Sequence, residues 1–229
     1  MRFRVDVAAG APGIPWPEVH SPARGVGYAL IRSQDEQLAT QLHDHGWAGS
    51  PLVPLGVSPP LFQGAPRRHG VYTTSDRGSV WLGSPVPQIA AALLAGIAGR
   101  SEIRWGSVAL MVKGVQLEDI PDHQAGETVF ESRTPVLLRH ENEYIMPEHE
   151  AYQNRLRHNL AHRADVLGLP NAVDLDVLEA GPRRRFEVQR KPRFGATIRV
   201  RITAAPTLLD ALYVGGIGLA TNQGFGWLR

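Results

Sequence analysis

The sequence predicts an α+β protein made of two tandem β-α-β-β-α-β domains of the ferredoxin-like (RRM-like) type, with a C-terminal glycine-rich loop. Both halves of the chain contain short alternating apolar stretches, typical of strands, and two apolar patterns at helical spacing. A polar stretch, residues 118–126, separates the halves. Five glycines fall within residues 214–226 and indicate a loop before the last strand.

The first domain is expected over residues 1–122. Residues 2–8 alternate as a strand, and apolar residues at three- and four-residue spacing from about residue 25 predict one helix that ends near His43. Gly46 is suited to follow the end of that helix. The remaining expected elements are short strands and a second helix that begins with proline: strands 61–62, 71–74 and 79–82, helix 85–99 and strand 108–117.

The second domain is expected over residues 123–229 and repeats the order of elements. Its expected elements are strand 128–139, helix 148–166, strands 173–179, 184–190 and 196–203, helix 207–213 and a final strand. The glycine-rich loop therefore falls between the last helix and the last strand. At that edge of the sheet it can face a groove between the two domains.

Composition excludes several classes of function. A chain of 229 residues with 43% hydrophobic residues can bury one large core or two ordinary ones. The N-terminus alternates as a strand rather than a signal peptide, and no apolar run approaches the roughly 18 residues of a membrane span. We therefore expect a cytoplasmic protein with no membrane partner. The chain has no cysteine, which excludes disulfides, cysteine nucleophiles and cysteine-ligated zinc.

Basic residues are concentrated in one segment. The net charge is only +2, but residues 183–193 contain six basic residues and one acidic residue, so the rest of the chain sums to −3. Phe186, Val188 and Phe194 interleave with these cations, as in a hairpin that packs one face and offers the other to RNA phosphates. A solvated hairpin without a ligand is the alternative.

The glycine-rich loop is consistent with more than one role. It lacks the Gly-Lys-Ser/Thr of a P-loop and the third glycine of a dinucleotide-binding motif. Residues 224–228 resemble the core strand of the RNA-recognition motif, but the chain ends where a further helix and strand would follow. Gly216, Gly218 and Gly224 are the glycines expected to have positive φ or to approach a phosphate closely. A tight turn before an edge strand is the alternative.

Five segments together resemble one known family. They are the first strand, the end of the first helix, a segment after the domain boundary, a stretch of the long helix and the C-terminal loop: residues 2–5, 42–46, 134–139, 154–160 and 213–227. They are similar to the CRISPR-associated endoribonucleases that cut precursor guide RNA within each repeat, the sixth family of Cas proteins. The resemblance covers nearly the whole chain and implies the tandem ferredoxin-like fold.

The resemblance also implies a catalytic histidine and tyrosine. His43 stands at the position of the family's active-site histidine, and Tyr28 matches a tyrosine found in several members. On one continuous helix, 15 residues rotate by roughly 1500°, which leaves both side chains within about 60° of the same face. The lysine that follows the histidine in some members has no counterpart here. Charge stabilisation is therefore assigned to His45, Arg67 or Arg68.

The implied activity is metal-independent cleavage of precursor CRISPR RNA, with no cofactor. The 2′-hydroxyl attacks the adjacent phosphorus and leaves a 2′,3′-cyclic phosphate and a 5′-hydroxyl, and histidine suits the proton transfers because its ordinary pKa is about 6.5. The implied partner is CRISPR repeat RNA; a homodimer and other proteins of an interference complex are left open. The residues expected to bind RNA are Arg139, Arg184, Arg190, Lys191, Arg193, Gly216, Gly218 and Gly224.

Other interpretations stay open. The chain is alternatively a non-catalytic RNA-binding subunit on the same tandem fold, or a ferredoxin-like protein that binds a small anion in its glycine-rich loop. His43 alternatively caps a helix end, and Tyr28 belongs to the core. His158 and His162 have the spacing of metal ligands, but Asn159 stands where the zinc-protease motif needs glutamate.

Overall fold

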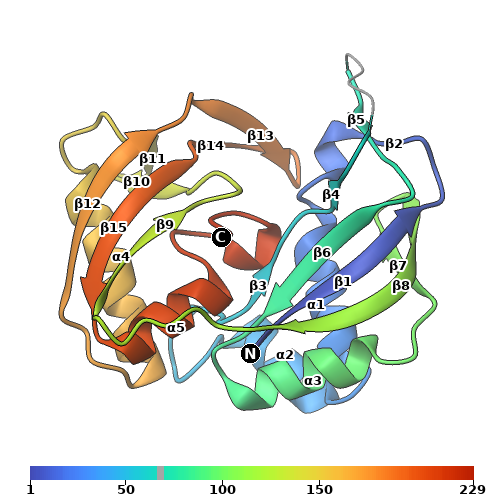
Figure 1. The fold of residues 1–229 in the computed structure, drawn as a ribbon, viewed down its shortest axis with the longest axis horizontal. Coiled ribbons are helices and arrows are strands. Elements are labelled where there is room, and N and C mark those ends of the chain that lie inside the picture. Colours follow the sequence, from blue (N-terminus) through green and yellow to red (C-terminus); the bar gives the residue numbers. More distant parts are fainter. Residues whose placement is uncertain (66–69) are drawn as a thin grey trace.

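The computed structural model describes residues 1–65 and 70–229 and contains two α+β domains that lie side by side (Figure 1). The expected α+β class with tandem ferredoxin-like domains is confirmed. The N-terminal half contains, in order, β1 (Arg2–Ala9), β2 (Gly13–Ile14), the 3₁₀ turn η1 (Trp16–Glu18), α1 (Pro22–Arg32), α2 (Glu36–Asp44), β3 (Gly56–Val57), β4 (Leu61–Phe62), β5 (Tyr72–Thr73), β6 (Gly78–Gly83), α3 (Pro87–Ile97), β7 (Glu102–Trp105) and β8 (Val108–Glu118).

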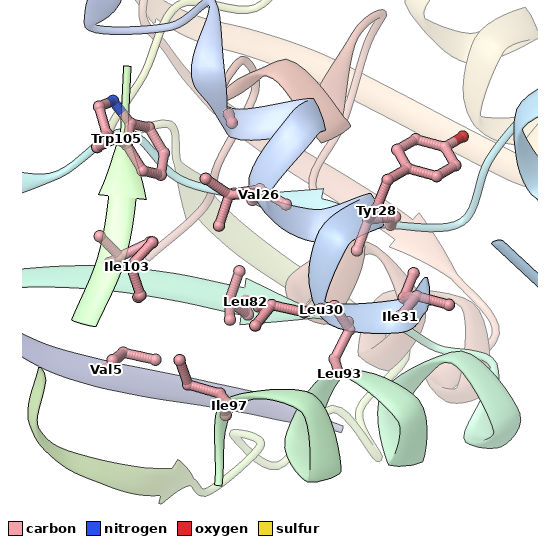
Figure 2. Close-up of a cluster of buried hydrophobic side chains, with 14 of the residues drawn as sticks. Val5, Val26, Tyr28, Leu30, Ile31, Leu82, Leu93, Ile97, Ile103 and Trp105 are labelled. Carbon is pink, nitrogen blue, oxygen red and sulfur yellow. The ribbon is translucent and has the colours of Figure 1, made fainter. Parts of the chain in front are cut away.

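The first sheet has the strand order β3-β6-β1-β8-β7, with β4 also paired to β6. Its central strand β1 pairs antiparallel with β6 and β8, so that Arg2 lies between Gly83 and Glu118. Phe3, Val5 and Val7 are buried on one face of β1, where they join a single core with side chains of α1 and α3. Figure 2 shows this core, with Val5, Leu82, Leu93 and Ile97 gathered under α1.

The C-terminal half contains, in order, β9 (Glu127–Glu131), β10 (Leu138–His140), β11 (Glu143–Ile145), α4 (Tyr152–Leu167), β12 (Val173–Ala180), β13 (Arg184–Val188), β14 (Lys191–Gly195), β15 (Ile198–Ala204), α5 (Pro206–Gly215) and the 3₁₀ turn η2 (Thr221–Gln223). Its sheet has the order β12-β15-β9. The expected final strand does not form after the glycine-rich loop. The last residues make only an isolated bridge between Leu228 and Ser132 and a hydrogen bond from the Arg229 amide to the Glu131 carbonyl at 2.9 Å.

The single helix expected up to His43 is wrong, because the chain forms two helices with a break at residues 33–35. Asp35 caps the second helix, and its carboxylate accepts a hydrogen bond from the Leu38 amide at 2.8 Å. An aspartate with this N-capping geometry favours a new helix start over continuation. The apolar spacing continues across the break because both helices pack on the same core.

Two expected strands also differ from the structure. The strand expected over 128–139 ends at Glu131, and β10 pairs with β11 instead; Pro135, which cannot donate to a ladder, lies in the gap. The strand expected over 184–190 is the first arm of the β13–β14 hairpin. Gln189 and Arg190 form its two-residue turn, both with positive φ, as a tight hairpin turn requires. The short strands β2, β3, β7, β11 and β14 were not expected.

Arg2 holds the two domains together. Its guanidinium lies 2.7 Å from Glu118 and donates to the carbonyls of Tyr213 and Leu228 at 2.9 and 3.0 Å. It also stacks over the rings of Tyr213 and Trp227. The C-terminal segment thus lies between the domains, where Figure 1 places the C-terminus. Among the described residues, no helix is both long enough and apolar enough to cross a membrane.

Candidate active site at the junction of the two domains

His43 lies in a pocket of about 560 Å³ at the domain junction. The pocket is built from α1, the end of α2, the loop that follows α2, and the glycine-rich loop. Its lining residues are Arg24, Tyr28, Leu42, His43, Asp44, His45, Gly46, Gly49, Pro51, Val53 and Asn222. Two segments about 180 residues apart in the sequence therefore form one site, because the C-terminal segment returns to the first domain.

The His43 side chain is accessible to solvent and is oriented by Asp44. It stands in the last turn of α2 with 60% of its side chain exposed, and its Nδ1 lies 2.7 Å from Oδ1 of Asp44. The hydrogen bond from His43 holds the pKa of the Asp44 carboxyl below its usual range, so this carboxylate stays ionised near neutrality. With Nδ1–H donating to Asp44, Nε2 is the ring nitrogen left to exchange a proton.

Tyr28 lies beside His43, as expected, although not because of a shared helix. The rings are 5.8 Å apart and nearly perpendicular, because α2 turns back against α1. Figure 2 shows the Tyr28 ring pointing away from the core side chains of the same helix. Its hydroxyl donates to the Leu42 carbonyl at 3.1 Å, and burial raises the pKa of this phenol. Tyr28 therefore supports the backbone next to His43 and keeps its proton.

The positive charge of the pocket comes partly from a residue that the sequence analysis missed. His45 lines the pocket, as expected, whereas Arg67 and Arg68 lie outside the described residues. Arg24 lies one helical turn before Tyr28, lines the same pocket and opposes the rise of the Tyr28 pKa through its charge. The four-residue spacing from Tyr28 to Arg24 is the signal that could have found it.

A second pocket of about 300 Å³ adjoins the first and extends the site towards α4. Pro51, Val53 and Asn222 line both pockets. On its far side lie His162, whose Nε2 is 3.3 Å from the Ser50 hydroxyl, and Arg163. The Arg163 guanidinium donates to the Gly218 carbonyl at 3.2 Å, and burial lowers its pKa to about 10. The two pockets together form a groove that crosses from one domain to the other.

The glycine-rich loop shapes this groove. Gly216, Gly218 and Gly224 have φ values of 80°, 76° and 85°. Each is buried, and their amides donate to the Leu212 carbonyl, the Asn159 side chain and the Thr221 carbonyl.

A Cβ on any of these three glycines would press against the protein, for instance within 2.9 Å of the Leu137 carbonyl at Gly218. The positive φ expected of these glycines is confirmed, and their engaged amides show that they allow close packing of the protein backbone. Their contact with RNA stays a prediction. The partly accessible residues of this part of the loop are Leu219, Ala220 and Asn222, whereas Thr221 is buried.

Comparison with protein families supports the resemblance found in the sequence. Residues 118–229 match the family model of the C-terminal region of CRISPR-associated protein Cas6. The C-terminal region of the chain is therefore similar to that of Cas6 proteins. The matched region contains the glycine-rich loop and the β13–β14 hairpin but not His43, so the role of His43 rests on the geometry of its pocket. No curated protein sequence is significantly similar to the chain.

Solved structures share the fold of the whole chain. One is a Cas6-related protein from Pyrococcus furiosus, with a TM-score of 0.80 and 16% identity over 100% of this chain and 97% of that one. Another is described as a RAMP protein binding different RNA substrates, with a TM-score of 0.79, 18% identity and coverage of 100% and 98%. A Cas6 product complex has a TM-score of 0.67, 18% identity and coverage of 100% and 99%. At these identities the likeness concerns the fold.

The cations expected to bind RNA lie outside the His43 pocket. Arg184, Arg190 and Lys191 are exposed on the β13–β14 hairpin. Arg139 and Arg193 form a separate cluster, because both contact Tyr144, the first over the face of its ring and the second through its hydroxyl. Within the described residues, no three histidine or acidic side chains are gathered as metal ligands.

Proposed function

We propose that this chain is a Cas6-type endoribonuclease that cuts precursor CRISPR RNA within its repeats and acts in the cytoplasm. The observation that carries the proposal is His43, held by Asp44 at 2.7 Å in an open pocket at the domain junction. In this proposal residues 1–122 supply the histidine. Residues 123–229 supply the cationic hairpin and the glycine-rich loop that borders the groove.

The proposed reaction is transesterification within the RNA. The 2′-oxygen forms a bond to the adjacent phosphorus while the bond from phosphorus to the 5′-oxygen breaks, which leaves a 2′,3′-cyclic phosphate and a 5′-hydroxyl. One proton leaves the 2′-hydroxyl and another reaches the 5′-oxygen. His43 exchanges one of these protons through Nε2, and such help typically contributes about 10²- to 10⁴-fold to the rate.

The neighbours of His43 have distinct proposed roles. Tyr28 positions the end of α2 through its hydrogen bond to the Leu42 carbonyl. Arg24 and His45 line the same pocket and supply positive charge beside the phosphorane, where the family's lysine is missing. The proposed transesterification needs electrostatic stabilisation and proton transfer, and the side chains of the pocket can supply both.

The cations of the second domain are proposed to bind the RNA backbone. Arg184, Arg190 and Lys191 are exposed along one hairpin, and Arg139 with Arg193 is grouped on Tyr144. Cations spread along a strand track phosphates more readily than they recognise base edges. The similar solved structures described as a RAMP protein binding RNA substrates and as a Cas6 product complex support RNA as the ligand.

The deciding experiment separates binding from chemistry. His43→Ala should leave the Kd for repeat RNA nearly unchanged and lower the single-turnover rate by at least about a hundredfold, because it removes one acid–base group. His158→Ala is the matched control, since His158 is exposed on α4 and lines neither pocket. Tyr28→Phe should reduce the rate less, because the ring keeps its packing and only one hydrogen bond is lost.

The substrate and the chelator provide further tests. A single 2′-deoxy substitution just upstream of the cut should abolish cleavage, EDTA should leave it unchanged, and the product should resist 3′-end ligation until its cyclic phosphate is opened. Cleavage of the 2′-deoxy substrate would contradict the mechanism. A wild-type chain that binds repeat RNA tightly and never cuts it would instead identify a non-catalytic RNA-binding subunit, with His43 as a helix cap.

A further inference from the structure

A third pocket, separate from the His43 groove, lies between the two domains on the side of the hairpin. It has a volume of about 500 Å³ and shares no lining residue with the His43 pocket. The turn η1 of the first domain forms one wall, and strand β13 of the second domain forms the other. Its lining residues are Trp16, Pro17, Arg184, Arg185, Phe186 and Glu187.

Trp16 gives this pocket a large aromatic surface whose position is restricted by its neighbours. It is 52% exposed, which is unusual for a tryptophan in the described part of the chain, where Trp81, Trp105 and Trp227 are each at most 8% exposed. Pro15 and Pro17 flank it and restrict its backbone, and the Tyr72 ring packs edge-on against it with centroids 5.5 Å apart. An aromatic ring held in this way loses little conformational freedom when a flat ligand stacks on it.

The opposite wall, strand β13, carries two positive charges and is held in place by the packing of Phe186. Arg184 and Arg185 are exposed, and nothing on their own strand neutralises them except Glu187. Phe186, between them and Glu187, packs on His20 at 4.9 Å and on Phe225 of the glycine-rich loop at 5.4 Å. The wall therefore connects directly to the loop that borders the His43 groove, so a ligand here is held in a fixed relation to that groove.

We propose that this pocket binds one unpaired nucleotide of the RNA substrate, away from the site of cleavage. The base stacks on Trp16, and its phosphate lies against Arg184 and Arg185. The combination of an exposed aromatic ring and adjacent guanidinium groups fits a single-stranded nucleotide, which needs a stacking surface and a cation. The Glu187 carboxylate repels the phosphate and so places it at the arginine end. This inference rests on the proposed function for the identity of the RNA.

The test compares variants in their affinity for a single-stranded RNA oligonucleotide with the CRISPR repeat of the source genome. Trp16→Ala should weaken binding by about 5- to 150-fold, the range that loss of one stacked base produces, while Trp16→Phe should retain most of the affinity. Leu117→Ala is the matched control, because Leu117 is 65% exposed and lines none of the three pockets. Melting temperatures of the variants should stay close together because Trp16 is a surface residue.

An abasic scan locates the nucleotide. Replacing each nucleotide in turn by an abasic one should weaken binding to the wild type at one position away from the cut, and that loss should disappear in Trp16→Ala. If Trp16→Ala binds like Leu117→Ala and no abasic position depends on Trp16, the inference is wrong, although the wild type can still bind and cut. A Trp16→Ala chain that binds RNA normally but loses a protein partner would overturn it in favour of a protein interface. A wild type that binds no repeat RNA would reject the proposed function itself.

Discussion

His20 is expected to make the fold lose stability in mild acid. The residue lies just before α1, is only 5% exposed, and stacks face to face on Phe225 with ring centroids 4.3 Å apart. Its Nδ1 lies 3.3 Å from the Gln223 carbonyl. Burial lowers the pKa of this imidazole from 6.5 to about 4, so His20 is neutral in the folded protein at neutral pH.

The sign and size of the effect follow from proton linkage. Between pH 6.5 and 4, the unfolded chain binds a proton at His20 that the folded chain does not bind, so the free energy of unfolding falls as the pH falls. At about 1.4 kcal/mol for each unit of pKa difference, the loss amounts to about 3 kcal/mol and is complete below pH 4. Above pH 6.5, His20 adds no pH dependence to the stability.

Chemical denaturation across this pH range tests the prediction. His20→Phe keeps a ring on Phe225, loses about 1 kcal/mol through the missing hydrogen bond to Gln223, and cannot titrate. From pH 7.5 to pH 4 the wild type should therefore lose about 3 kcal/mol more of its unfolding free energy than the variant. Leu117→Ala supplies the control, because Leu117 is exposed and cannot titrate, so this variant should keep the pH dependence of the wild type. Parallel pH curves for the wild type and His20→Phe would refute the assignment of His20 as a buried neutral histidine.

Two further predictions concern the loop and the hairpin. Gly226→Ala should destabilise the fold by more than the roughly 1–2 kcal/mol that a left-handed backbone costs an alanine, because its Cβ would collide with the Ile217 carbonyl. Gly49→Ala is the control, because Gly49 has a φ of 76° with open space around it, so this variant measures the backbone cost alone. Equal losses of stability in the two variants would contradict the packing argument. Replacing Arg184, Arg190 and Lys191 by alanine should weaken binding to many RNAs alike and reduce the slope of log K against log salt by up to about 0.7 per lost contact. An unchanged affinity and an unchanged slope would mean that the hairpin does not bind RNA.

The amino-acid sequence by itself determined several of the main strands and helices and the position of the main loop. The alternating residues of β1, the proline that starts α3 and the glycines of the C-terminal loop each act on the local backbone, so their effects are visible in the sequence. Local patterns also predicted that His43 lies at the end of a helix and that the cationic segment forms a hairpin. Resemblance to the repeat-processing family then linked these local features to one activity.

The tertiary structure decided which of these residues meet. Tyr28 reaches His43 because Asp35 starts a second helix that turns back, and periodicity could not reveal this because both helices face one core. The C-terminal loop brings Asn222 to the His43 pocket, and the amides of its glycines form hydrogen bonds inside the protein.

Trp16 faces β13 only because the two domains pack together. Periodicity and turn residues report on neighbours within about one turn or one hairpin, whereas a pocket between distant segments depends on how whole domains bury their surfaces against each other.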